Sequence, residues 1–171
     1  MKSILVSILA FFSVNAIAGG DHSMPAPSVP KEFESLKALV GTWQGKTIMN
    51  GKEESATVSY KLTSGGTAIV ETLGEGTPHE MVTVYSARKN KIFMTHYCAI
   101  GNQPEMSLKK AAANSYVFEM NGHAGIDDPK EMHMHALTLT LTDPNHLKQE
   151  WTNFNNNKKA DIAVFDFTRK M

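Results

Sequence analysis

The stretch Met132-His133-Met134-His135-Ala136-Leu137-Thr138-Leu139-Thr140-Leu141-Thr142 decides how the rest of the chain is interpreted. Its second half alternates leucine with threonine, which is typical of a β-strand with one buried and one solvent-exposed face. Continuing the same alternation towards the N-terminus places His133 and His135 on the leucine face. The stretch therefore predicts a long strand that carries two histidines on its inner face.

Short segments of this kind follow one another along most of the chain, with turn signals such as Asn50-Gly51 and Asp143-Pro144-Asn145 between them. A short amphipathic helix over Lys31–Val40 precedes them. Together they predict an all-β fold, an antiparallel up-and-down barrel of about ten strands with a short N-terminal capping helix. The predicted strands are Thr42–Met49, Ser55–Thr63, Thr67–Leu73, Glu80–Ala87, Lys91–Ala99, Glu105–Lys110, Ser115–Asn121, Met132–Thr142, His146–Asn155 and Asp161–Lys170.

The N-terminus predicts export. Residues 1–18 combine Lys2, an apolar segment and the small-residue pattern Ala16-Ile17-Ala18, which is typical of a cleaved signal peptide. Residues 19–30 contain three prolines and are predicted to be a flexible leader, so residues 31–171 form the barrel domain. We expect a periplasmic or secreted protein with no membrane span after cleavage.

Composition limits the class of partner. Lys plus Arg and Asp plus Glu both number 17, so the chain lacks the basic excess of nucleic-acid-binding proteins. Cys98 is the single cysteine, which excludes a disulfide within the chain. A small molecule is the expected partner, and the oligomeric state stays open.

Pairing adjacent strands as hairpins assigns the inward residues to two ends of the barrel. Apolar residues such as Trp43 and Leu139 gather at one end, which is expected to be closed. The other end is expected to be an open mouth, with Val82 opposite His96 and His135 opposite Asn153. The polar residues predicted at the mouth are His96, His133, His135, Glu80 and Asn153, and the predicted apolar wall is Tyr60, Met94, Phe118, Leu137 and Trp151.

The segment Gly41-Thr42-Trp43-Gln44-Gly45, directly after a short helix, resembles the start of lipocalin-like (calycin) barrels. The resemblance is nearest to their nitrobindin-like and fatty-acid-binding side. The segments Thr77–Val82, His96–Pro104 and Gln149–Trp151 also look like a group of uncharacterised exported bacterial proteins. The resemblance implies a barrel that binds a small apolar or planar ligand.

Nitrobindin-like proteins bind haem through one histidine on a late strand, and the chain departs from that pattern twice. Thr47 replaces the third glycine of the opening motif, and the last predicted strand contains no histidine. If the resemblance extends to haem, its ligand would be His133, His135 or His96.

A metal-dependent enzyme is the alternative from another class. Neutral imidazoles and a carboxylate suit zinc or a similar divalent ion, so His133, His135 and His96 could hold a metal. Glu80 would then be a further ligand or a general base of a hydrolase or isomerase. The same polar groups could also hydrogen-bond only with one another. The sequence leaves these alternatives open.

Overall fold

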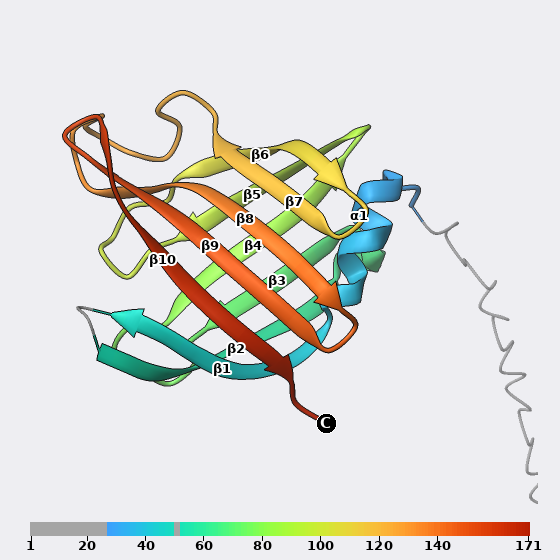
Figure 1. Cartoon of the computed structure of the whole chain (residues 1–171). Coiled ribbons are helices and arrows are strands. Elements are labelled where there is room, and N and C mark those ends of the chain that lie inside the picture. The colour runs from blue at the N-terminus through green and yellow to red at the C-terminus, as the bar shows by residue number, and fades with distance from the viewer. Residues whose placement is uncertain (1–26, 50–51) are drawn as a thin grey trace, which may run out of the picture.

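The chain folds into a closed barrel of ten antiparallel strands in the order of a simple meander, in which β1 pairs with both β2 and β10 (Figure 1). We describe residues 27–49 and 52–171 of a computed structural model; the predicted signal peptide, residues 1–18, and most of the predicted leader lie outside this part. The strands are β1 Gly41–Met49, β2 Lys52–Thr63, β3 Ala68–Leu73, β4 Met81–Arg88, β5 Lys91–Tyr97, β6 Glu105–Ala112, β7 Ser115–Met120, β8 His133–Asp143, β9 His146–Asn155 and β10 Lys158–Arg169. The predicted fold class is confirmed.

One end of the barrel is closed by α1 (Lys31–Leu36) and the 3-10 turn η1 (Lys37–Leu39), as Figure 1 shows. Phe33, Leu36 and Leu39 are fully buried there. Trp43 packs beneath them, and its indole Nε1 donates to the carbonyl of Leu39 at 2.8 Å. The predicted capping helix and the predicted position of Trp43 are confirmed. No helix in the described part of the chain is long and apolar enough to cross a membrane.

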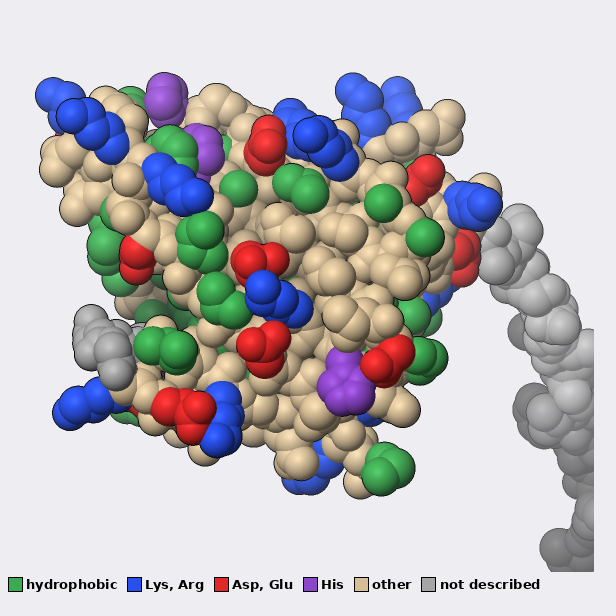
Figure 2. Space-filling model, in the orientation of Figure 1, with side chains coloured by type: hydrophobic (Ala, Val, Ile, Leu, Met, Phe, Trp, Pro, Cys, Tyr) green, Lys and Arg blue, Asp and Glu red, His purple; other side chains and the backbone are tan. Residues whose placement is uncertain are grey.

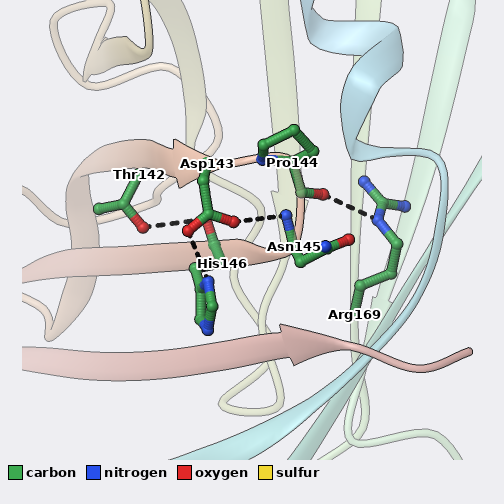
Figure 3. A network of polar contacts seen from close by, with 6 residues as sticks. All are labelled: Thr142, Asp143, Pro144, Asn145, His146 and Arg169. Atoms are coloured by element: carbon green, nitrogen blue, oxygen red, sulfur yellow. Dashed lines mark hydrogen bonds and ion pairs between the residues drawn. The ribbon is translucent and has the colours of Figure 1, made fainter.

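Arg169 ties the C-terminal strand to this closed end. Its guanidinium lies 4.0 Å from the centre of the Trp43 ring and donates to the carbonyls of Ala38 and Val40. Its Nε also donates to the carbonyl of Pro144 in the β8–β9 turn (Figure 3). In the same turn Asp143 accepts from the backbone N–H of Asn145. Arg169 therefore joins the helix, the β8–β9 turn and the end of β10.

Closure between β1 and β10 depends on a close approach of the two backbones at Gly45. Gly45 pairs with Phe167, and a Cβ atom at Gly45 would lie 1.8 Å from the carbonyl oxygen of Asp166. No side chain fits in that space. Glycine is therefore required here because of contact between strands.

The middle of the barrel is filled by side chains. The residues predicted to form an apolar ligand wall, Tyr60, Met94, Phe118, Leu137 and Trp151, are all buried in this core. Between β8 and β9, Leu137 pairs with Trp151 and Leu139 with Gln149, which places the leucine face of β8 in the core. The predicted wall residues are therefore part of the packed core.

The predicted faces of β3 and β4 are wrong by one residue. Tyr60 pairs with Glu71, and Thr83 pairs with both Glu71 and His96, where the sequence predicted Val82 opposite His96. A shift of one residue exchanges the two faces of a strand. The observed register buries Ile69 and Leu73, and it carries Glu71 inward between them.

The first residues of β8 also differ from the prediction, because the ladder with β9 shifts between Met134 and Ala136. One extra residue in a strand reverses the alternation beyond it. Met134 therefore pairs with Asn153, the predicted partner of His135, and His133 pairs with Phe154. The prediction that His133 and His135 face the barrel interior is wrong.

Candidate ligand cleft

The open end of the barrel contains a cleft of about 540 Å³. β1 and β10 pair from Trp43–Arg169 to Thr47–Phe165 and then diverge, as the left side of Figure 1 shows. The cleft lies where they separate, and the turn between β3 and β4 borders it. Figure 2 shows hydrophobic side chains on both sides of the recess at that edge. A cleft of this size lies within the range of small-molecule sites.

Most of the cleft lining is apolar. Leu73, Met81, Met134, Ala163 and Phe165 line it and also pack against the barrel core. Ile48 and Ile162 stand at its rim and are 68% and 43% exposed. The polar and charged lining residues are Thr47, Glu54, Ser55, Thr57, Thr77, His79, Asn153 and Asp161. The cleft thus joins an apolar floor to a polar rim.

Thr47 helps to hold the two edges of the cleft together. It is buried, and its hydroxyl donates to the carbonyl of Val164 on β10 at 2.9 Å. The threonine that replaces the third glycine of the lipocalin-like motif therefore contributes a bond between β1 and β10.

A row of buried polar residues crosses the barrel interior next to the apolar floor. Tyr60, Glu71, Thr83 and His96 are paired neighbours on β2, β3, β4 and β5. Leu73 and Met81, which lie two residues from Glu71 and Thr83 on the same faces, belong to the cleft. The row is therefore one side-chain layer deeper than the cleft lining.

Glu71 and Gln149 each form buried hydrogen bonds in this layer. The Tyr85 hydroxyl donates to Glu71 Oε2 at 2.6 Å. On the opposite wall Trp151 Nε1 donates to Gln149 Oε1 at 3.0 Å, and Gln149 Nε2 donates to the Tyr60 hydroxyl at 2.5 Å. Burial raises the pKa of Glu71 to about 7, against hydrogen bonds that lower it. Its Oε1 has no partner in the described structure.

His96 is the one predicted site histidine that faces the barrel interior. Its ring lies 4.5 Å from the ring of Trp151, centre to centre, and its Nδ1 is 2.9 Å from the Thr83 hydroxyl. Burial lowers the pKa of His96 to about 4, so the imidazole is neutral near pH 7. Its Nε2 is buried without a partner among the described residues.

His133 and His135 lie on the outer face of the barrel, at the start of β8. Both rings lie beside the ring of Phe154, which stacks on His135 at 3.8 Å. The bulge therefore removes these two imidazoles from the cleft and places Met134 there instead.

The hydrogen bonds of this pair determine its tautomers. A carbonyl oxygen can only accept, so His133 Nδ1 donates to Glu131 O at 2.8 Å. In the neutral pair His133 Nε2 then accepts from His135 Nδ1 at 3.2 Å. Burial, followed by the charge of His133, lowers the pKa of His135. Only His135 Nε2 remains as a free lone pair.

The structure does not bring Glu80 to His96. Glu80 is exposed in the turn before β4, and its Oε2 accepts from the backbone N–H of Gly76 at 2.6 Å. The shifted register of β4 places Thr83, three residues later, beside His96. The prediction that Glu80 lies with the histidines at an inner polar mouth is wrong for this reason.

Of the predicted site residues, Asn153 alone lines the cleft. Sequence reasoning missed Met134, Phe165 and Ala163 in the lining, and Glu71 and Tyr85 in the layer beneath it. The alternation Ile69-x-Glu71-x-Leu73 was a usable signal, since two large aliphatic residues share the face of Glu71. Nothing local in the sequence indicates the bulge that turns Met134 inward.

The three histidines predicted as haem or metal ligands do not fit that role at the cleft. His96 is in the packed layer beneath it, whereas the register of β8 puts His133 and His135 on its outer face, where His133 is buried and His135 half-buried. Among the histidines that the structure describes, His79 alone lines the cleft. Within residues 27–49 and 52–171, no group of three or more His, Cys, Asp or Glu side chains could hold a metal ion.

Comparison with known proteins identifies the fold and no more. No protein-family model matches the chain, and no curated protein matches it in sequence. The chain is similar in structure to Rv2717c from M. tuberculosis, with a TM-score of 0.61 and 14% identity over 84% of this chain and 100% of that one. It is also similar to a protein of unknown function from the DUF3598 family of Nostoc punctiforme PCC 73102, with a TM-score of 0.55 and 11% identity. That match covers 87% of this chain and 53% of the other. The barrel is compatible with ligand binding.

Proposed function

We propose that this protein is an exported binding protein that holds a small apolar or planar molecule in the cleft at the open end of its barrel. The observation that carries the proposal is the cleft itself, about 540 Å³ with an apolar floor. The other end is closed by α1, so a ligand has one way in and out.

The exposed rim supports the same proposal. Ile48 and Ile162 both line the cleft while much of their surface remains in contact with water. Covering the apolar side chains that border a concave site lowers the free energy by about 25 cal/mol per Å² of apolar surface removed from water. A bound apolar molecule would cover these side chains and displace water from Met134 and Phe165.

Export is supported by the pattern of residues 1–18, where a charged start, an apolar segment and a small-residue site follow in order. Full-length protein expressed in a bacterium would test this part. The expected result is a periplasmic product whose N-terminus lies near Gly19. A cytoplasmic product that keeps residues 1–18 would contradict it.

Ligand binding can be tested with Nile red, an uncharged apolar dye whose fluorescence rises in an apolar environment. Ala163→Phe places a ring in the cleft, because Ala163 is a half-buried lining residue. Ala111→Phe is the matched control, since Ala111 is exposed at the end of β6. We expect the wild type and Ala111→Phe to bind the dye and Ala163→Phe to lose at least about tenfold in affinity. Equal binding by folded Ala163→Phe would overturn the proposal.

A further inference from the structure

We infer that the cleft selects apolar ligands whose polar end is uncharged or positively charged, and that it discriminates against apolar acids. The inference rests on the proposed function, because it names the ligand class of the same cleft. The charged residues that line the cleft in the described structure are Glu54 and Asp161, and no lysine or arginine lines it there.

Glu54 is on the inner face of β2. It pairs with Thr47 of β1, whose side chain is buried towards the interior. Ala56, two residues along the same face, also lines the cleft. The Glu54 side chain therefore lies on the β2 side of the cleft, next to Ala56.

Asp161 stands on the β10 side of the cleft, two residues before Ala163. Neither Asp161 nor Glu54 forms an ion pair with any other residue in the described part of the chain. Their negative charges therefore act on whatever occupies the space between the two walls.

The neighbouring residue Glu53 shows the contrast within the same strand. Its side chain is on the outer face of β2, where it pairs with Lys46 at 2.6 Å. The outward glutamate is thus neutralised by a partner and the inward glutamate is not. Charge complementarity at the cleft rim favours a cationic group and opposes a carboxylate.

The size of the effect follows from Coulomb's law. A unit charge about 5–8 Å from one carboxylate at a wet rim changes affinity by about threefold to tenfold. The carboxylate increases the affinity for a protonated amine and decreases the affinity for an ionised acid. The affinity for an alcohol should lie between the two. The resemblance to fatty-acid-binding barrels would suggest an acid, so the two expectations can be separated by experiment.

The experiment is displacement of Nile red by decylamine, decanol and decanoate, which share one chain length and differ in the charge of the polar end. It is done at about pH 7.5, where a free alkyl carboxylic acid is ionised and a primary alkylamine is protonated. We expect decylamine and decanol to displace the dye at concentrations about fivefold or more below that of decanoate.

The double variant Glu54→Gln/Asp161→Asn should reduce this preference to within about twofold while Nile red still binds. Glu53→Gln is the matched control and should keep the wild-type order. Decanoate competing as well as decanol, or an unchanged order in the double variant, would overturn the inference and leave the proposed function intact. Failure of the wild type to bind Nile red would overturn the proposed function and this inference with it.

Discussion

Glu71 and His96 should change the pH dependence of stability in opposite directions, and single variants can separate the two. Burial raises the pKa of Glu71 from 4.5 to about 7 and lowers that of His96 from 6.5 to about 4. A change of 1 in pKa corresponds to about 1.4 kcal/mol, so each group accounts for about 3 kcal/mol across its range.

The sign for each group follows from the protons bound in the folded and unfolded states. Folded Glu71 keeps its proton up to about pH 7, whereas unfolded glutamate loses it near 4.5, so its contribution to stability falls as the pH rises between those values. Folded His96 stays neutral down to about pH 4, whereas unfolded histidine gains a proton near 6.5, so its contribution falls as the pH drops. The two slopes nearly cancel between pH 4.5 and 6.5.

Urea unfolding followed by tryptophan fluorescence across that range gives the free energy of unfolding. In Glu71→Gln only the His96 slope remains, so stability relative to wild type should rise by about 3 kcal/mol from pH 4.5 to 7. For His96→Phe, the free energy of unfolding relative to wild type should fall as the pH rises over the same range. Glu75→Gln, at an exposed turn residue, is the control for a changed surface carboxylate. A flat difference profile for Glu71→Gln would refute the reasoning.

Three further substitutions test the fold. Arg169→Ala removes the stacking and hydrogen bonds at the closed end, so it should lower the free energy of unfolding by about 2–4 kcal/mol in denaturant titrations, while Lys170→Ala should change little. Gly45→Ala should cost at least about 3 kcal/mol, because its Cβ meets the backbone of Asp166; a variant with the wild-type melting temperature would contradict this. Phe118→Ala should cost about 3–5 kcal/mol by the same measurement, and a loss below about 1 kcal/mol would show that the barrel centre is not close-packed.

The strand meander and the capping helix could be predicted because their signals are local. Alternating leucine and threonine in β8, turn residues between segments and the spacing of Phe33, Leu36 and Leu39 each act within a few neighbouring residues. The pairing of Leu137 with Trp151 follows from the short turn between β8 and β9. Such local patterns can be interpreted without knowledge of the contacts that distant parts of the chain make.

The faces of β3 and β4 could not be predicted in the same way. Both alternations of β4 contain apolar residues, Val82 and Val84 on one face and Tyr85 on the other, so the pattern does not choose between them. The choice is made by contacts with other strands, in which Tyr85 binds the carboxylate of Glu71. A buried glutamate on a strand is avoided by any prediction from hydrophobicity alone.

The predicted mouth and the cleft lie at the same end of the barrel, but most of the residues predicted at the mouth do not line the cleft. Asn153 follows from the alternation of β9, in which it shares the face of Trp151. The histidines do not, because a single bulge reverses the faces of the residues that precede it. The predicted positions of the two histidines on β8 therefore depended on the absence of a bulge in that strand.

The bulge at His135 also divides β8 into two parts that can change independently during evolution. Residues from Leu137 onwards are constrained by the packed centre, whereas Met134 belongs to the cleft lining. Loss of His135 would remove the bulge and leave both Met134 opposite Asn153 and Leu137 opposite Trp151, because Met134 would then stand two residues before Leu137. A single-codon deletion at the bulge would thus keep the cleft lining while changing only the outer face of the strand.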